Sequence, residues 1–261
     1  MSLYNFRDNR KIKYGVIPAA GKGSRIASLP YTKILPKPML PIIDKPILEY
    51  VLENMKKFGV EEIFIIVGPK KDVVIRYFED GSLWNVKITY IEQKEPLGIA
   101  HAIGLVRSYI SEPFLVILGD DITLFDQEEI SSVINMFFNK NAWVIEGVVE
   151  EQNIQRIKRT CSVILGDNGK ILDIEEKPQK PRSMLRGIGI YLFHPIVFNF
   201  IEKTPISNIR REKEITHTIR LMTSYGKAYA YLFKKSININ VNTLEDLRLA
   251  IKTLLIHKDK M

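Results

Sequence analysis

The sequence predicts an α/β fold of three layers, in which helices cover both faces of a mostly parallel sheet. Two observations support this prediction. Apolar runs of strand length alternate with helical patterns through the first half of the 261-residue chain. Two of these runs, residues 63–67 and 114–118, are almost continuously apolar, which is typical of strands buried on both faces of a parallel sheet. Such alternation builds strand–helix–strand units with right-handed crossovers.

The first half contains four predicted strands, at residues 14–18, 63–67, 86–91 and 114–118. The helix predicted over residues 48–58 repeats its apolar side chains at helical spacing, and Gly59 follows it as a stop signal. Asp126 with Glu129 resembles a capping box that opens a helix reaching Phe137. Two shorter helices are expected at residues 72–79 and 99–109.

The pattern changes after Ala142, where strands follow one another with few helices between them. The sequence Asp167-Asn168-Gly169-Lys170 is a tight-turn signal that joins two of these strands. We interpret this half as a small β-rich lobe, facing the substrate and added to the same sheet. Its predicted strands are residues 142–149, 160–165, 170–175 and 187–193, followed by a helix near 212–225, a strand near 229–233 and a last helix at 244–256.

Composition and charge restrict the class of protein. A chain with 46% hydrophobic residues and a single cysteine is neither disordered nor a disulfide scaffold. The net charge of +8 favours polyanionic partners, either nucleic acid or small phosphorylated molecules. A nucleic-acid-binding protein would need a basic face with aromatic side chains placed for stacking, and we find no such motif. The lone Cys161, with no signal peptide or apolar run of membrane-spanning length, predicts a cytoplasmic protein without membrane contact.

A turn rich in small residues follows the first predicted strand, from Pro18 to Arg25. Small residues let backbone N–H groups approach a phosphate closely. The turn lacks the glycine spacing of a P-loop, and Ile26 stands where the dinucleotide fingerprint needs a third glycine. On these residues alone, a nucleotide-binding loop and a basic surface turn are equally compatible. The loop that follows supplies two further cations, Lys33 and Lys37.

Carboxylates and amides stand at two further points. Asp120 and Asp121 follow the fourth strand, at the carboxyl end of the sheet where ligands gather in open α/β folds. A carboxylate there can hold Mg²⁺ on a substrate's phosphates, although lone aspartates more often serve as turn or cap residues. Asn238, Asn240 and Asn242 alternate with apolar residues, so one face of an extended segment presents three amides. The alternative is turn and capping chemistry before the last helix.

The order of these motifs resembles that of the sugar-1-phosphate nucleotidylyltransferases, which include glucose-1-phosphate thymidylyltransferases and UTP–glucose-1-phosphate uridylyltransferases. The most specific stretch is Ala20-Gly21-Lys22-Gly23-Ser24-Arg25, followed by the proline-rich residues 36–46. Residues 93–100 resemble the family's base-recognition loop, and residues 118–121 its metal-aspartate motif. Residues 175–178 match its sugar-phosphate motif, and residues 210–216 the helix entry that touches that phosphate. The matches run in family order from about Tyr14 to Ala250.

The resemblance implies a Rossmann-like sheet of the nucleotide-diphospho-sugar transferase type. It also implies a single domain over residues 1–261, with a nucleotide-binding half at 14–141 and a sugar-phosphate-binding half at 142–261. We see no hexapeptide repeat near the C-terminus and therefore expect no C-terminal β-helix domain. The implied enzyme joins an NTP, dTTP or UTP, to a sugar 1-phosphate, favouring glucose 1-phosphate. The products are an NDP-sugar and pyrophosphate, formed by Mg²⁺-dependent in-line attack on the α-phosphate. Family members are often homo-oligomers. The alternative is a catalytically weak or inactive member that senses nucleotide or regulates a partner.

The resemblance also assigns roles by position. The catalytic cations would be Arg25, Lys37 and Lys177. The nucleotide would be bound by Ala20, Gly21, Gly23, Ser24, Gln93, Pro96 and Gly98. The sugar phosphate would be bound by Glu176, Lys177, Arg210 and Gly189. The Mg²⁺ ligands would be Asp120 and Asn240.

Two departures from the family pattern concern the metal and the sugar. Asn240 takes the place of the family's usual second aspartate, and Ser162 stands where a glycine usually lines the sugar pocket. An amide oxygen can still coordinate Mg²⁺, although it brings no charge. The residue types also suit the reaction, because the attacking phosphate oxygen is already anionic and needs no general base. The obstacle is repulsion between two polyanions, which cationic side chains and Mg²⁺ offset.

Overall fold

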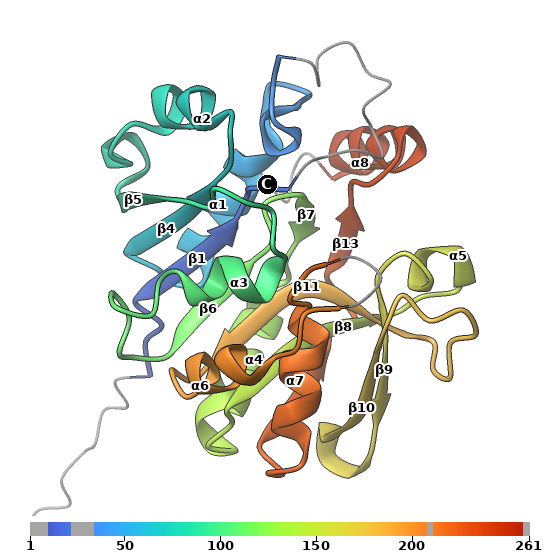
Figure 1. Cartoon of the computed structure of the whole chain (residues 1–261). Coiled ribbons are helices and arrows are strands. Elements are labelled where there is room, and N and C mark those ends of the chain that lie inside the picture. Colours follow the sequence, from blue (N-terminus) through green and yellow to red (C-terminus); the bar gives the residue numbers. More distant parts are fainter. Residues whose placement is uncertain (1–9, 22–33, 208–210, 258–261) are drawn as a thin grey trace, which may run out of the picture.

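The central feature is a nine-stranded sheet in a computed structural model that describes residues 10–21, 34–207 and 211–257. Its first half is a parallel ladder in the order β6–β1–β4–β5 (Figure 1). These strands are β6 (Phe114–Ile117), β1 (Tyr14–Pro18), β4 (Glu62–Val67) and β5 (Lys87–Glu92). They lie at the predicted positions, which confirms the α/β class with a mostly parallel sheet.

The second half of the chain extends the same sheet, as predicted. β11 (Leu185–Phe193) runs antiparallel to β6 and pairs with both β8 (Val144–Glu150) and β9 (Cys161–Leu165). β10 (Ile171–Glu176) pairs with β9, and β12 (Ala228–Leu232) lies parallel to β8. Asn168 and Gly169, between β9 and β10, both adopt left-handed backbone conformations, as the predicted tight turn requires.

Helices cover both faces of the sheet, and β1 shows why. Val16 packs in one hydrophobic cluster and its neighbour Ile17 in another, because successive strand residues point to opposite faces. The Ile17 face carries α1 (Ile47–Lys57), α2 (Lys71–Phe78) and α4 (Gln127–Asn139). The Val16 face carries α3 (Ile99–Gly104), α6 (Val197–Lys203) and α7 (Ile215–Thr223). The short α5 (Ile154–Ile157) precedes β9.

A small antiparallel pair of strands lies beside the main sheet, and one of the two strands was not predicted from the sequence. The sequence analysis predicted no strand at β7 (Asp121–Leu124), which pairs with β13 (Ile237–Asn240) so that Asn240 lies opposite Asp121. Apolar residues of both strands pack against α8 (Leu244–Ile256), whose bounds are as predicted. The pair therefore brings together two polar segments that are more than a hundred residues apart in the chain. Another short pair joins β2 (Pro41–Ile42) to β3 (Lys45–Pro46).

Only one of the two side chains expected to form a capping box at α4 does so. Asp126 caps the helix by accepting from the backbone N–H groups of Glu128 (3.1 Å) and Glu129 (3.3 Å). The Glu129 carboxylate does not return to the cap. It accepts from the backbone N–H groups of Lys234 (2.7 Å) and Ser236 (2.9 Å) and from the Ser236 hydroxyl (2.6 Å). Several donors bind the carboxylate better than one cap N–H would, so Glu129 fixes the β12–β13 connection instead.

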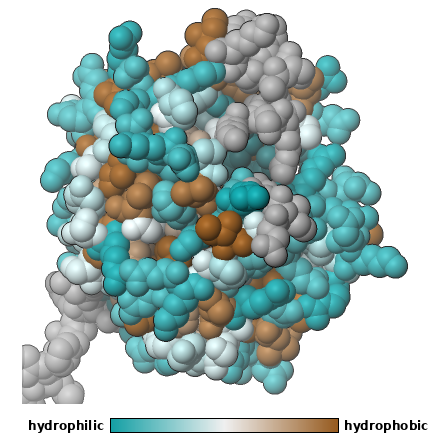
Figure 2. Space-filling model, in the orientation of Figure 1, coloured by the Kyte–Doolittle hydropathy of each residue, from teal (hydrophilic) through white to brown (hydrophobic). Residues whose placement is uncertain are grey.

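Two other expectations about helices needed correction. α3 ends at Gly104, and the chain reaches Tyr109 through turns in which N–H groups bond to the carbonyl three residues back, rather than through an α-helix. α6 follows β11 directly and was not predicted. Among the described residues, we find no helix with both the length and the apolar character needed to cross a membrane. On the face shown in Figure 2, hydrophilic residues predominate and hydrophobic ones occur in small groups between them.

Candidate active site

A cleft with a volume of about 340 Å³ opens beyond the carboxyl ends of β1 and β6. This is where an open α/β sheet gathers its ligands. Every sequence-predicted site residue that the structure describes lines this cleft: Ala20, Gly21, Lys37, Gln93, Pro96, Gly98, Asp120, Glu176, Lys177, Gly189 and Asn240. The remaining predicted residues lie outside the described ranges: Gly23, Ser24, Arg25 and Arg210.

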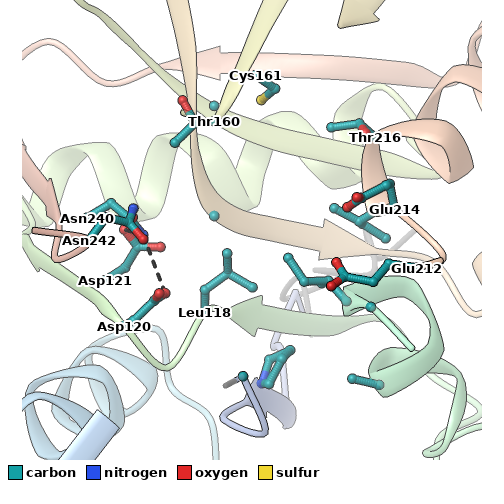
Figure 3. Close-up of a pocket in the computed structure, with 18 of the residues that line it drawn as sticks. Leu118, Asp120, Asp121, Thr160, Cys161, Glu212, Glu214, Thr216, Asn240 and Asn242 are labelled. Atoms are coloured by element: carbon teal, nitrogen blue, oxygen red, sulfur yellow. Dashed lines mark hydrogen bonds between the residues drawn. The ribbon is translucent and has the colours of Figure 1, made fainter. Parts of the chain in front are cut away.

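The cleft has two chemically different sides (Figure 3). Asp120, Asp121, Asn240 and Asn242 gather on one side. Acidic and hydroxyl side chains at the start of α7 face them from the other side, namely Glu212, Glu214 and Thr216. We call the first side the carboxylate–amide side and the second the α7 side.

Lys37 holds the carboxylate–amide side together. Its ammonium lies 2.5 Å from Asp120 Oδ2 and donates to Asn242 Oδ1 at 3.2 Å. The side chain is only 9% exposed, so its charge acts in a medium that screens it less than water does. Lys37 begins a short 3₁₀ turn (Lys37–Met39) that presents it to the end of β6. The sequence analysis placed Lys37 among the phosphate-binding cations but missed Asn242 as its partner.

Asp121 lies beneath Asp120 and is almost completely buried. Its Oδ1 accepts from Asn240 Nδ2 at 2.9 Å and from Asn238 Nδ2 at 3.4 Å. Its Oδ2 has no hydrogen-bond partner in the part of the chain that the structure describes. Burial, reinforced by the neighbouring Asp120 charge, raises the pKa of Asp121 well above its ordinary value. Two of the three predicted amides therefore line the cleft, Asn240 bonded to Asp121 and Asn242 to Lys37, whereas Asn238 bonds to Asp121 but does not line the cleft.

The oxygens on this side fit Mg²⁺. Asp120 supplies a carboxylate, and Asn240 supplies an amide oxygen, because its Nδ2 donates to Asp121 Oδ1 and, at 3.4 Å, to Asp120 Oδ1. The described residues contain no cluster of three or more histidine, cysteine, aspartate or glutamate side chains that could hold a metal. Mg²⁺ is usually bound through one or two carboxylates together with substrate phosphates and water. The donor set therefore fits Mg²⁺, and substrate phosphate oxygens would complete the coordination in place of water.

Gln93 and Gly98 form a separate polar corner. Gln93 Nε2 donates to Gly98 O at 3.1 Å and lies 2.8 Å from His101 Nδ1. A carbonyl can only accept, so this contact orients the Gln93 amide. Burial and the nearby Lys213 charge lower the pKa of His101, which favours the neutral ring with Nδ1 as acceptor. The group that Gln93 has left for a ligand is its amide oxygen.

Gly98 must be glycine at this corner. It adopts φ +99°, and a Cβ there would come within 2.5 Å of Lys213 O and 2.8 Å of Lys213 N. The loop that carries the corner is therefore fixed against the segment that leads into α7.

Glu176 and Lys177 come from the end of β10. Glu176 Oε2 accepts from Thr216 Oγ1 at 3.2 Å, and Glu176 Oε1 lies 3.5 Å from Lys177 Nζ. Lys177 adopts φ +42°, and its N–H donates to Thr160 O at 2.7 Å. A non-glycine residue in the left-handed region costs about 1–3 kcal/mol, and functional sites are one place where such strain is retained. Backbone strain thus accompanies the predicted role of Lys177.

One expectation from the sequence is corrected by strand geometry. Ser162 does not line the cleft but is fully buried, with its hydroxyl donating to Ser183 O at 3.0 Å. Its neighbour Cys161 lines the cleft instead, because adjacent residues of β9 point to opposite faces. The lining side chains that the sequence analysis did not single out include Arg186, Glu212 and Glu214. Alternation along residues 238–242 was the signal that pointed to Asn242.

Glu146 is a titratable group next to Cys161, and a variant of Glu146 tests whether burial raises its pKa. It is fully buried, Cys161 Sγ lies 3.5 Å from its Oε1, and burial raises its pKa from 4.5 to about 8. Glu146 therefore keeps a proton in the folded state that the unfolded chain has lost, so its contribution to stability falls as pH rises from 4.5 to about 8.

We expect Glu146→Gln to flatten this dependence. Between pH 4.5 and about 8, the unfolding free energy of the variant should rise relative to that of the wild type by at most roughly 5 kcal/mol, because each pKa unit corresponds to about 1.4 kcal/mol. Urea unfolding at a series of pH values measures the difference. Glu150→Gln, on an exposed position of the same strand, is the matched control. Parallel curves for the wild type and Glu146→Gln would refute the assignment.

Comparison with protein families matches residues 14–254 to the family described as "Nucleotidyl transferase". The chain is 34% identical over 216 residues to the low-salt glycan biosynthesis nucleotidyltransferase Agl11 of Haloferax volcanii, covering 82% of this chain and 58% of that protein. It therefore spans little more than half the length of that relative. It is 33% identical over 252 residues to UTP–glucose-1-phosphate uridylyltransferase 2 of Staphylococcus saprophyticus, covering 86% of each chain.

A solved structure also resembles the chain closely. The crystal structure of UDP-glucose pyrophosphorylase complexed with UDP-glucose superimposes with a TM-score of 0.83 at 28% identity, covering 94% of this chain and 99% of that one.

Proposed function

Because the chain belongs to the nucleotidyl transferase family, and within it to the sugar-1-phosphate nucleotidyltransferases, we propose that it joins UTP or dTTP to a sugar 1-phosphate. Glucose 1-phosphate is the favoured sugar substrate, and the products are an NDP-sugar and pyrophosphate. The observation that carries this proposal is the convergence of Lys37, Asp120, Lys177 and Asn240 on one cleft. Those residues come from four separate segments, and their chemistry is that needed to bring two anionic molecules together.

The sugar phosphate oxygen attacks the α-phosphorus of the NTP, forming a new P–O bond while the bond to the β-phosphate oxygen breaks. The oxygen is already anionic, so the chain needs no general base. Positioning of the two substrates accounts for much of the rate, up to about 7–11 kcal/mol. Asp120 and Asn240 would hold Mg²⁺, which would neutralise charge on the triphosphate. Lys37 lies against the same carboxylate and adds a fixed positive charge where the leaving group develops.

The polarity of the Gln93 corner favours a pyrimidine base that carries an N–H donor on the edge facing Gln93. Uracil and thymine carry a hydrogen-bond donor at N3, whereas cytosine and adenine carry an acceptor at the corresponding ring nitrogen. The Gln93 amide oxygen is an acceptor, because its NH₂ group is used by Gly98 and His101. This polarity favours UTP or dTTP over CTP and ATP. The 2′-hydroxyl that distinguishes ribose from deoxyribose is not read by this contact.

The side chains of the α7 side and of the end of β10 are suited to binding the sugar phosphate. Carboxylates accept hydrogen bonds from sugar hydroxyls, and Glu176 is held for this purpose by Thr216 and Lys177. Lys177 supplies the positive charge that a phosphate needs at this end of the cleft. Glu214 is buried at the start of α7 and also lines the cleft.

A substrate matrix tests the proposal. UTP, dTTP, CTP, ATP and GTP are each combined with several sugar 1-phosphates, and pyrophosphate release is measured with Mg²⁺ and with a chelator. We expect release with UTP or dTTP only, and none with the chelator. Nucleotide binding without pyrophosphate release under every combination would instead favour the nucleotide-sensing alternative.

Lys177→Ala is expected to weaken use of the sugar phosphate. The lost charge-assisted contact corresponds to about 1.5–3 kcal/mol, so the KM for the sugar 1-phosphate should rise roughly ten- to a hundredfold while the KM for the NTP changes little. Steady-state kinetics against each substrate measure the two effects. Lys180→Ala removes an exposed ammonium from the same loop and is the matched control. A rise confined to the KM for the NTP would contradict the role of Lys177.

A further inference from the structure

Arg186 is a buried cation in the wall of the cleft beside the carboxylate–amide side, and the proposed function gives it no role. It lies on β11 and is only 3% exposed. Its Nε donates to Glu151 Oε2 at 3.2 Å, and Glu151 is itself buried. Its Nη2 donates to Asn238 Oδ1 at 3.1 Å. Its Nη1 lies 3.5 Å from Gly187 O, so each of the three guanidinium nitrogens donates to a protein group, and Arg186 acts through those partners.

The guanidinium determines which way the Asn238 amide faces. Arginine has five N–H donors and no acceptor, so the Asn238 group that faces it must be the oxygen. The NH₂ group is thereby turned the other way, where it donates to Thr123 Oγ1 at 2.8 Å and to Asp121 Oδ1 at 3.4 Å. A neutral side chain in place of Arg186 would leave this buried amide without its orienting donor.

The hydrogen bonds of Asp121 extend this argument from Asn238 to the amide of Asn240. Asp121 Oδ1 accepts from both Asn238 Nδ2 and Asn240 Nδ2. With its NH₂ group turned to the carboxylates, Asn240 keeps its oxygen for a ligand. The flipped amide would present NH₂ to a cation and could not coordinate it. A continuous chain of hydrogen bonds therefore links Glu151 and Arg186 to the oxygen proposed as a metal ligand.

We infer that Arg186 is a positioning residue for the divalent-cation site, acting through Asn238 and Asp121 to fix the amide orientation of Asn240. The inference rests on the proposed function, which makes Asp120 and Asn240 the metal ligands. Partners of this kind orient the groups that bind a metal, and their loss typically lowers metal affinity or activity about ten- to a hundredfold. Arg186 also places a positive charge behind the buried Asp121, with Glu151 balancing it.

The experiment measures binding of Mn²⁺ alone, from the loss of the free-ion electron paramagnetic resonance signal, and then steady-state kinetics. We expect Arg186→Met to weaken Mn²⁺ binding roughly ten- to a hundredfold and to lower kcat with little change in the KM for the sugar 1-phosphate. Arg186→Lys should recover part of the affinity, because it restores one donor to Asn238. Arg107→Met is the matched control, since Arg107 also binds a glutamate and an asparagine, Glu202 and Asn199, but is exposed and away from the cleft.

A double-mutant cycle separates positioning from general stability. Asn238→Ala breaks the same chain one step later, so Arg186→Met combined with Asn238→Ala should bind Mn²⁺ no more weakly than the worse single variant. If Arg186→Met does not fold, Asn238→Ala and Arg186→Lys carry the test. Wild-type Mn²⁺ affinity in Arg186→Met, an equal loss in Arg107→Met, or additive losses in the cycle would each overturn the inference. Failure of the wild type to bind Mn²⁺ would instead overturn the metal ligands of the proposed function, and the inference with them.

Discussion

Asp120→Ala should abolish most turnover, with a loss in kcat of about a thousandfold or more. The carboxylate contacts the Lys37 ammonium at 2.5 Å and accepts from Asn240 at 3.4 Å, so its removal affects the cation and the amide together. A divalent ion contributes several kcal/mol of charge stabilisation in the transition state, and about 1.4 kcal/mol corresponds to each factor of ten in rate. Pyrophosphate release at saturating substrates, with Mg²⁺ varied, measures the effect.

The Asp120 prediction distinguishes a metal ligand from a structural aspartate. Asp120→Asn keeps an oxygen but removes the charge, so it should retain some activity and need a higher Mg²⁺ concentration. Asp72→Ala, at an exposed position in α2, is the matched control and should leave kcat unchanged. If Asp120→Ala turned over like the wild type while remaining folded, neither the metal site nor the role of Lys37 could be as proposed.

The residues with local signals were predictable from the sequence. The parallel strands β4 and β6 were predictable because burial on both faces of a sheet requires continuous apolar runs. The last helix, α8, was predicted to the residue because Thr243 precedes a helical pattern, and it does form a capping box with Asp246. Asp120 was found for a related reason, since it directly follows a buried strand.

The pairing of distant short segments was not predictable. β7 and β13 each have four residues, and their register depends on packing against α8 rather than on any local pattern. That register decides that Asn240 lies opposite Asp121. Arg186 was invisible for the same reason, because nothing near it in the sequence indicates that Asn238 is its partner. Ser162 and Cys161 show the limit most sharply, since a shift of one residue along a strand exchanges the buried face for the cleft.

Gly189→Ala should combine lost activity with lost stability. Gly189 lies on β11 with φ +70°, and an added Cβ would overlap Asp121 Oδ2 and come within 2.8 Å of Leu118 Cδ1. Asp121 has little freedom to move away, because Asn240 and Asn238 both hold its other oxygen. Displacing Asp121 would turn the Asn240 amide, so we expect kcat to fall about a hundred- to a thousandfold. The unfolding free energy should fall by about 2–4 kcal/mol, as measured by urea unfolding.

Gly59→Ala separates the two causes of this effect. Gly59 follows α1 with φ +83°, and a Cβ there would meet no heavy atom within 4 Å. It therefore pays the backbone strain alone, about 1 kcal/mol, and should keep full activity. If Gly189→Ala lost no more stability than Gly59→Ala and kept its turnover, Asp121 would have to be free to move, and the hydrogen bonds that hold it could not be what orients Asn240.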